Sequence, residues 1–471
     1  MAGTGAMNEV SEWVQARSAR LERELFDWLR IPSVSSDPER AERMVEAVDW
    51  LCAKLASLGF EVELWREEGS PPILLASRRG RAGAPTVLIY GHYDVQPAEP
   101  LERWDTHPFD PVIREGRVIA RGATDDKGQL HLQLAAIEAL LSLDGELPVN
   151  VRFVVEGEEE VGSTALLQGL EARAEELACD AVVISDMEML GPGSPAVEIG
   201  FRGILGARLT VTGPAEDLHS GLYGGAVMNP AVALCEILAA LRGRDGRVRI
   251  EGFYDDVRTF SVEERSELGE LPFDEDAFLE ATGVEDGAGE AGFSTLERIW
   301  CRPAFDVHSL EVAGPAEGAK TAIPAAASAL LSFRLVPRQS TRAVAEQLRR
   351  RVAAATPGGV RSSVEITARA EPWETGRAEP LLEIARQALE EAFGSPAELV
   401  RGGGSLPIVS LFDRCLGAPV LLIGFGLPGS NPHGPNEWLD LDTYRRGIGA
   451  LVTLYRKIGS SAAKSREGGR P

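Results

Sequence analysis

The sequence predicts an α/β fold: a mixed sheet covered by helices, with a smaller ferredoxin-like α+β domain inserted into it. Short apolar runs alternate with helical stretches before Ile204, the pattern changes there, and the first pattern returns after Leu381. The length of 471 residues also indicates more than one domain. Because one hydrophobic core stops growing at about 250–300 residues, we expect two domains.

The first domain should open with two helices and continue into a sheet covered on both faces. Apolar residues recur at helical spacing over residues 9–58, interrupted by a loop at Ile31-Pro32-Ser33. Apolar or β-branched runs typical of doubly covered strands follow, and helical stretches at 127–141 and 164–176 separate the first three. These strand-like runs are residues 86–90, 151–155, 181–184 and 420–423.

The inserted domain shows a β-α-β-β-α-β order in outline, which is typical of a small open sheet with helices on one face. We therefore expect domain segments 1–204, 205–375 and 376–471, the first and last forming one domain. The acidic stretch 263–292 predicts loops with short helices, and the tail 460–471 predicts disorder. The insert's predicted elements are strand 205–211, helix 229–241, strand 326–335, helix 341–355 and strand 364–368.

Charge and cysteine content narrow the class of protein. The chain has 48 Lys and Arg against 72 Asp and Glu, a net charge of −24, which repels nucleic acid and anionic membranes but attracts divalent cations. Its five cysteines form no C-x-x-C pair, which indicates reduced buried thiols. Residues 1–10 lack a basic flank followed by an apolar core, and no apolar run reaches about 18 residues. We expect a cytoplasmic protein.

Five polar segments lie at strand ends or in adjoining loops. Taken singly, each has an ordinary interpretation: a loop histidine, a helix N-cap, an acidic surface loop. Four carboxylates crowded after an apolar strand would, however, repel one another unless a cation lay among them. The segments centre on His92, Asp125-Asp126, Glu156 to Glu160, Asp186 and His433.

One cleft could hold all five segments, because the carboxyl ends of strands in an open α/β sheet build its binding sites. Carboxylate oxygens with imidazole nitrogens suit zinc, manganese or cobalt. A carboxylate bridging two ions about 3.5–4 Å apart is the usual arrangement in dinuclear hydrolases. Spacing does not select the metal.

As an ordered set over nearly the whole chain, the motifs resemble the M20 family of metallopeptidases and, within it, the dipeptidase branch of carnosinase-like and cytosolic nonspecific dipeptidases. The resemblance implies a catalytic domain with two divalent ions, zinc first, and an inserted lid that also forms a homodimer. The motifs are Gly91-His92-Tyr93-Asp94-Val95-Gln96-Pro97, residues 104–108, Arg121 to Gly128, Glu159-Glu160, Asp186, Asp217 to Gly221, Ser332 to Pro337 and His433.

The resemblance assigns Asp125 as the carboxylate that bridges both ions. It pairs His92 with Asp186 on one ion and Glu160 with His433 on the other. Asp94 would orient His92, and Glu159 would be the general base for a metal-activated water. The triple Glu leaves the register open, and the position of Gly162-Ser163 favours Glu159 and Glu160 over Glu158.

The resemblance also assigns residues in or near the inserted domain. His219 would reach the neighbouring subunit's site and donate to the oxyanion, and Arg334 would bind a substrate carboxylate. Gly404 and Ser405 match a substrate loop, and Thr321 would line the carboxylate pocket. The remaining histidines match no ligand position and are interpreted as structural; they are His107, His131 and His308.

The sequence thus predicts a dinuclear metal-dependent hydrolase of dipeptides. Asp rather than Glu at position 186 favours dipeptidases over aminoacylase-like members, although Glu188 lies only two residues away. An alternative is an N-acyl-amino-acid amidohydrolase of the aminoacylase or desuccinylase type. A non-catalytic protein that binds peptide or metal is a third hypothesis, against which the presence of Glu159 and of every proposed ligand argues.

Overall fold

The computed structural model describes residues 2–284, 287–312, 321–376 and 379–467, and the chain divides into two compact units. The first comprises Met1–Ile199, Thr375–Val400 and Leu411–Pro471, and the second comprises Gly200–Glu374 and Arg401–Ser410. The short segment 401–410 therefore goes with the second unit, which the expected third segment 376–471 did not anticipate.

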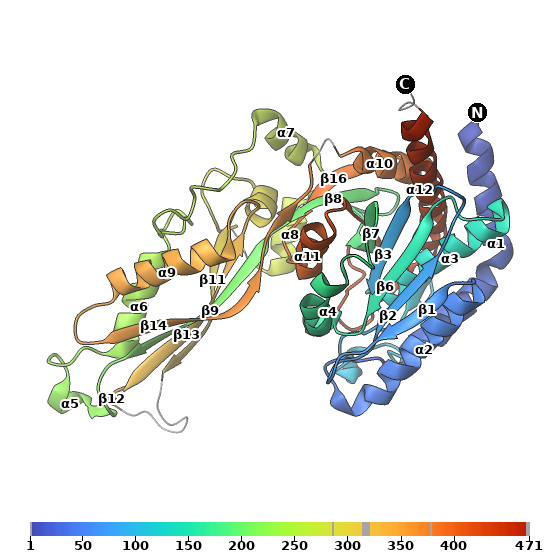
Figure 1. Cartoon of the computed structure of the whole chain (residues 1–471). Coiled ribbons are helices and arrows are strands. Elements are labelled where there is room, and N and C mark those ends of the chain that lie inside the picture. Colours follow the sequence, from blue (N-terminus) through green and yellow to red (C-terminus); the bar gives the residue numbers. More distant parts are fainter. Residues whose placement is uncertain (1, 285–286, 313–320, 377–378, 468–471) are drawn as a thin grey trace. The chain divides into compact units, whose positions relative to one another are not determined.

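The first unit is built on a mixed sheet, as predicted, with strand order β1-β2-β6-β3-β7-β17-β8 (Figure 1). Strands β6, β3, β7 and β17 run parallel to one another, whereas β1 pairs antiparallel with β2, β2 with β6, and β8 with β17. The strands are β1 (Glu61–Trp65), β2 (Ile73–Arg78), β3 (Thr86–His92), β6 (Asn150–Glu156), β7 (Ala181–Glu188), β8 (Ala196–Phe201) and β17 (Val420–Gly426). A separate small sheet has the order β18-β5-β4 and consists of β4 (Val112–Arg114), β5 (Arg117–Ile119) and β18 (Trp438–Asp440); β16 (Glu398–Gly402) pairs with β8.

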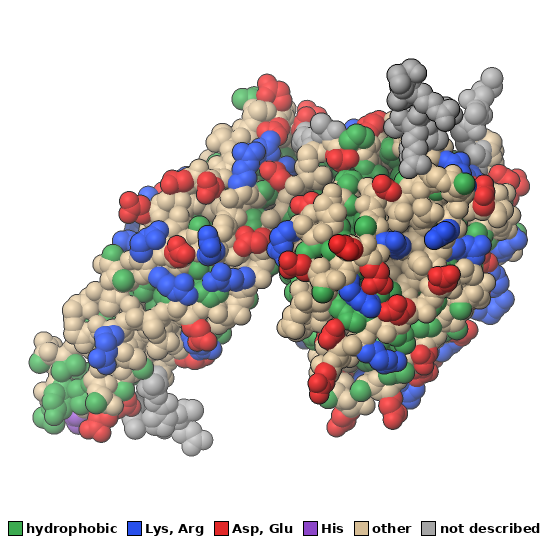
Figure 2. Space-filling view, in the orientation of Figure 1, with side chains coloured by type: hydrophobic (Ala, Val, Ile, Leu, Met, Phe, Trp, Pro, Cys, Tyr) green, Lys and Arg blue, Asp and Glu red, His purple; other side chains and the backbone are tan. Residues whose placement is uncertain are grey.

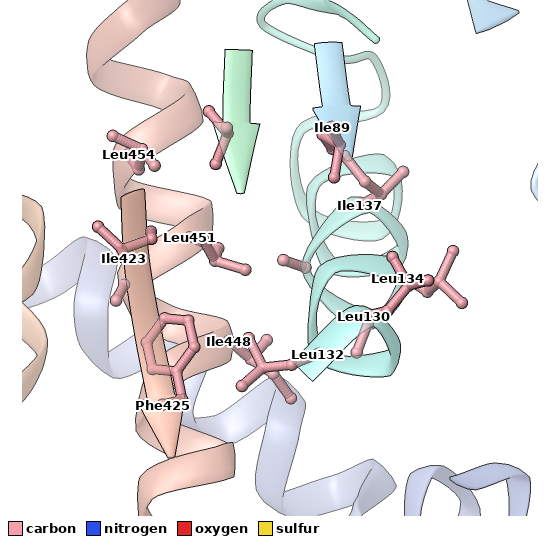
Figure 3. Close-up of a cluster of buried hydrophobic side chains, with 14 of the residues drawn as sticks. Ile89, Leu130, Leu132, Leu134, Ile137, Ile423, Phe425, Ile448, Leu451 and Leu454 are labelled. Carbon is pink, nitrogen blue, oxygen red and sulfur yellow. The ribbon is translucent and has the colours of Figure 1, made fainter. Parts of the chain in front are cut away.

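Three long helices of this unit pack against one another beside the sheet: α1, α3 and α12 (Figure 1). Helix α3 is apolar around most of its circumference because the sheet and the other two helices enclose it. Figure 3 shows its side chains meeting those of β3, β17 and α12 in the core, and this packing holds the strand ends that carry the site. The helices are α1 (Ala2–Leu29), α2 (Ala41–Ser57), α3 (Lys127–Asp144), α4 (Thr164–Gly169), α10 (Pro380–Phe393), α11 (Pro407–Leu416) and α12 (Leu441–Glu467).

The second unit has the predicted β-α-β-β-α-β order, as an antiparallel sheet β11-β13-β9-β14 on which α6 and α9 pack. Buried residues of the sheet and both helices form its own core. The elements are β9 (Gly203–Thr212), α6 (Pro230–Leu241), β11 (Ala304–Val312), β13 (Ala326–Leu335), α9 (Thr341–Ala355) and β14 (Arg361–Ala370). Shorter elements are β10 (Leu218–His219), α5 (Ser220–Tyr223), α7 (Val262–Glu270), α8 (Glu275–Thr282), β12 (Ala322–Ile323) and β15 (Trp373–Glu374).

Four local predictions were wrong. The helix expected at 164–176 ends at Gly169 and is followed by a 3₁₀ turn at Glu171–Arg173. The strand expected to end before Asp186 continues to Glu188, because β17 pairs with it as far as that residue. The tail expected to be disordered from residue 460 is helical to Glu467, and residues 468–471 lie outside the described part of the chain. The cysteines are free, as predicted, but only Cys301 is buried.

None of the helices in the described part of the chain combines the length and the apolar character that crossing a membrane requires.

Candidate metal centre

The residues expected to bind metal lie at the carboxyl-terminal edge of the parallel strands. His92 ends β3 and Asp186 lies near the end of β7, while Glu160 follows β6 in a 3₁₀ turn. Asp125 precedes α3, and His433 lies in the loop between β17 and β18. Because neighbouring parallel strands end at the same edge, five segments that are distant in sequence meet there.

The first group consists of His92, Asp125 and Asp186, whose ligand atoms all lie within 4.8 Å of one another. His92 Nε2 is 3.1 Å from Asp125 Oδ1 and 3.6 Å from Asp186 Oδ2. The other ring nitrogen, Nδ1, lies 3.0 Å from the backbone oxygen of Asp94 and 3.2 Å from its carboxylate. This contact directs Nε2 toward the two carboxylates, as a partner behind a metal-ligating histidine does.

The second group consists of Asp125, Glu160 and His433, with ligand atoms within the same 4.8 Å limit. His433 Nε2 is 2.9 Å from Asp125 Oδ2 and 3.2 Å from Glu160 Oε2. The two oxygens of Asp125 thus face different groups: Oδ1 faces His92 and Oδ2 faces His433. A carboxylate shared in this way has the geometry of a bridge between two cations.

The carboxylates at this edge of the sheet carry more negative charge than the two histidines can neutralise. Burial, followed by the charges of Asp186, Glu160 and Asp125, raises the pKa of Glu159 to about 8. Burial and the charge of Asp125 raise the pKa of Asp186 to about 6. Burial also acts to raise the pKa of Asp125, but hydrogen bonds from His433 and His92 outweigh it and hold that pKa below its usual value. Three carboxylates and two imidazoles in this geometry fit a pair of divalent cations.

The consecutive residues Glu158, Glu159 and Glu160 differ in what their side chains contact. The Glu158 carboxylate accepts a hydrogen bond of 3.0 Å from the backbone N–H of Ala165, in the first turn of α4. Glu159, by contrast, lies where the charges of the ligand carboxylates act on its pKa. Asp94, completely buried, accepts hydrogen bonds from the backbone N–H groups of Glu159 at 3.3 Å and Glu160 at 3.1 Å. One side chain therefore positions both the His92 ring and this turn.

Two residues that support the site had no assigned role in the sequence reasoning. Glu437, completely buried, accepts hydrogen bonds from the backbone N–H groups of Gly122 and Thr124 at 2.8 Å and of Asp125 at 3.1 Å, and pairs with Arg121 at 2.8 Å. Glu437 thereby fixes the loop that presents Asp125. Its partners lie more than 300 positions away, so no local pattern could have identified it.

The second, Gln96, donates to Glu160 Oε2 at 2.7 Å. The loop that carries His433 is also unusual, because Asn431, His433 and Asn436 all have positive φ. Non-glycine residues rarely adopt this conformation, and it concentrates at functional sites. Gln96 did occur in a quoted motif, but its partner could be found only in the structure.

The five residues expected from the inserted domain fall into two groups within the second unit. Arg334 Nη1 donates to Ser405 Oγ at 3.1 Å, with the exposed Gly404 beside it. His219 is exposed on β10, and the backbone oxygen of its neighbour Thr321 accepts a hydrogen bond from Ser220. Thr321 precedes the short β12, and Arg334 lies near the end of β13, so about 25 Å of β13 lies between the two groups.

The other three histidines make contacts of the kind expected for structural residues. His131 is buried with Nδ1 2.8 Å from the Tyr444 hydroxyl, and burial lowers its pKa to about 3. His308 Nε2 lies 2.7 Å from the hydroxyl of Ser332, and His107 Nδ1 accepts from a backbone N–H two residues on.

Residues 88–457 match Peptidase family M20/M25/M40. The chain belongs to this family. The predicted resemblance to the M20 family and to its dipeptidase branch is confirmed, and the protein is a metallopeptidase by family.

Relatives over nearly the full length are named as dipeptidases. The chain is 32% identical to the Cys-Gly metallodipeptidase dug1 of Schizosaccharomyces pombe, covering 97% of this chain and 99% of the relative. It is 29% identical to the human Beta-Ala-His dipeptidase, covering 96% and 92%.

Solved structures of M20 enzymes have the same fold. Dug1p from Saccharomyces cerevisiae superposes with a TM-score of 0.80 at 28% identity, covering 98% of this chain and 99% of that one. The M20 metallo-carboxypeptidase Sso-CP2 from Sulfolobus solfataricus gives a TM-score of 0.80 at 30% identity, covering 93% and 99%.

Proposed function

We propose that this M20 enzyme is a dinuclear metal-dependent dipeptidase. The observation that carries the proposal is the shared carboxylate, Asp125, between the group with His92 and Asp186 and the group with Glu160 and His433. Two divalent ions, zinc first with manganese or cobalt as alternatives, would be held by these five side chains. When bound, such ions polarise a scissile carbonyl and lower the pKa of an attacking water.

The residues of the chain supply the proton transfers. Glu159, whose burial and acidic neighbours raise its pKa, is the general base that takes the proton of the attacking water and passes it to the leaving amine. Asp94 supports this step by holding both the His92 ring and the backbone of Glu159. The contact between Glu158 and α4 supports the assignment of Glu159 rather than Glu158 as the base.

The second unit supplies substrate recognition and acts as a lid. Arg334 binds the substrate carboxylate, for which its guanidinium fork is well shaped, and Ser405 and Gly404 form the adjoining loop. His219 donates to the oxyanion in the neighbouring subunit of a homodimer, and Thr321, which lies beside His219, lines the carboxylate pocket of that same neighbouring subunit. The exposed Leu222 and Tyr223 next to His219 support such a subunit contact.

The apolar side chains at that end of the second unit can be seen in Figure 2 around the place of α5.

A cytoplasmic location and a small peptide substrate complete the proposal, and the names of the relatives suggest Cys-Gly and β-Ala-His as first candidates. No comparison favours the alternative N-acyl-amino-acid amidohydrolase.

The test is a substrate panel read with and without metal. Purified enzyme is treated with a chelator, the bound metal is quantified, and hydrolysis of Cys-Gly, β-Ala-His and N-acetylated amino acids is measured after adding zinc, manganese or cobalt. We expect about two ions per chain and hydrolysis of dipeptides only, lost on chelation and restored by metal. Full activity in metal-free enzyme, or turnover restricted to acylated amino acids, would refute the proposal.

A further inference from the structure

The contacts of Arg202 are the basis of an inference that rests on the proposed function and deepens it. We propose that Arg202 is a positioning residue that determines specificity for a free carboxylate: it holds the substrate loop 402–405 in place, orients Arg334 through Ser405, and adds a second positive charge beside it.

Arg202 contacts the loop three times. Its backbone N–H donates to the Gly402 oxygen at 3.2 Å and its side-chain Nε donates to the Gly403 oxygen at 3.2 Å. Its own backbone oxygen accepts a hydrogen bond of 2.7 Å from Ser405 Oγ. One residue between β8 and β9 therefore holds three of the four positions of the loop.

The guanidinium of Arg202 is also hydrogen-bonded to a second segment of the second unit. Its Nη1 donates to the backbone oxygens of Arg298 at 3.3 Å, within the π-helical turn Glu297–Cys301, and of Arg302 at 3.4 Å, directly after it. Gly403 fits closely into the same place, because a Cβ there would lie 3.0 Å from the Ile299 oxygen and 3.3 Å from Arg202 Nη2. The guanidinium thus ties the loop to a packed segment of the second unit.

The hydroxyl of Ser405 connects the two arginines. It donates its proton to the Arg202 oxygen and accepts from Arg334 Nη1 at 3.1 Å. With its single proton used in this way, Ser405 orients the Arg334 guanidinium. We therefore assign Ser405 to holding Arg334, in addition to its place in the substrate loop.

The charges of the two guanidinium groups act on each other. Burial and then the charge of Arg334 lower the pKa of Arg202 to about 10, against the opposing charge of Asp306. Among the described residues, neither group forms an ion pair with an Asp or Glu; their partners are backbone oxygens and a hydroxyl. A bound carboxylate would relieve this repulsion, whereas a neutral amide would not. The pair of charges therefore selects substrates that end in a free carboxylate.

The experiment compares two substrates that differ only in that group, Cys-Gly and Cys-Gly amide, on metal-loaded enzyme. The variants are Arg202→Gln, which removes the charge, and Arg202→Lys, which keeps the charge but loses the planar fork. Arg208→Gln is the matched control, because Arg208 lies on β9 and pairs with the exposed Glu311.

We expect Arg202→Gln to raise KM for Cys-Gly by about 10-fold to 100-fold, the loss of a charge-assisted contact, with kcat changed less than about threefold. KM for the amide should stay the same, so the preference for the carboxylate falls. Arg202→Lys should lie between wild type and Arg202→Gln, and Arg208→Gln should match wild type.

The inference is overturned if Arg202→Gln keeps the wild-type preference for Cys-Gly over its amide. It is also overturned if the variant raises KM equally for both substrates, since a purely structural role predicts equal losses of affinity. If Arg202→Gln does not fold, Arg202→Lys decides: an unchanged preference and KM would refute the positioning role. Wild-type enzyme that cleaves neither substrate with any metal would instead refute the proposed function, and this inference with it.

Discussion

The metal centre and the proposed substrate-binding residues are built in different ways. At the metal centre, residues from five segments meet within one unit, and buried partners such as Asp94 and Glu437 hold them in place. In the second unit, His219 lies on β10 of a separate two-stranded sheet and is exposed, whereas Arg334 lies near the far end of β13 in the four-stranded sheet. The difference teaches that the candidate metal ligands meet inside one unit of one chain, whereas the proposed roles of His219 and Arg334 in one pocket require the proposed second chain.

The largest expected effect tests the first half of this comparison. Glu159→Gln should lower kcat by about 10²-fold to 10⁴-fold, because it removes the proposed general base without changing the size of the side chain. Glu158→Gln is the matched control and should stay within about twofold of wild type, since Glu158 caps α4. Steady-state kinetics at equal metal content measure both. The reverse order of effects would overturn the assignment.

The second half of the comparison predicts complementation between subunits. His219→Ala should lose about 10²-fold to 10³-fold in kcat, as loss of an oxyanion donor does. Mixing and reassociating it with Glu159→Gln chains should restore about a quarter of wild-type activity. Half of randomly formed dimers are mixed, and one of their two sites has both residues. No recovery in mixtures, or a fully active monomer, would exclude the role of His219 in the partner's site.

A smaller effect is expected for Glu437→Gln. The variant keeps the shape of the side chain but removes the charge that pairs with Arg121 and that accepts from the Asp125 loop. Metal affinity should fall by about 10-fold to 100-fold, the usual cost of losing a partner behind a ligand. Titration with zinc measures this, and Glu391→Gln, on the surface beside Lys457, should bind as wild type does. Equal zinc affinities of Glu437→Gln and wild type would show that Glu437 does not support the metal centre.

The smallest effect concerns Glu198, a buried carboxylate on which another acidic residue, Glu188, acts. Burial and then the charge of Glu188 raise the pKa of Glu198 to about 8 in the folded chain, above its ordinary value of 4.5. Its neutral form therefore stabilises the fold below about pH 4.5, and this contribution is lost as pH rises toward 8, by at most about 1.4 kcal/mol per pH unit. In Glu198→Gln, the free energy of unfolding from denaturant melts should fall less steeply between pH 5 and 8 than in wild type. The same slope in both proteins would contradict a raised pKa for Glu198.

Several parts of the fold could be predicted because they depend on local pattern. The apolar run of β3 followed by His92 predicts both a buried strand and a polar group at its end. The alternation in β9 and β13 similarly predicts the second sheet. By contrast, the helix expected at 164–176 is broken after Gly169, although apolar residues continue beyond it.

Other parts depended on partners far away in the chain. The extent of β7 follows from its pairing with β17, and the placement of 401–410 follows from its contacts in the second unit. Asp186 lies in the first group with His92 and Asp125, but it belongs to β7 itself and does not follow the strand-like run 181–184 as a loop residue. Glu188 instead lies near Ser430, whose hydroxyl is 3.4 Å from its carboxylate.

The alternation of the main strands and helices and the family-specific motifs were determined by the sequence alone, because periodicity and motif are local properties of the chain. Only the tertiary structure decided that Asp125 faces two groups, that Glu437 holds its loop, and that Arg202 joins loop 402–405 to Arg334. Hydrogen bonds and charges act over a few ångströms in space. Residues that are hundreds of positions apart become partners only when the packed cores bring their strands and loops together.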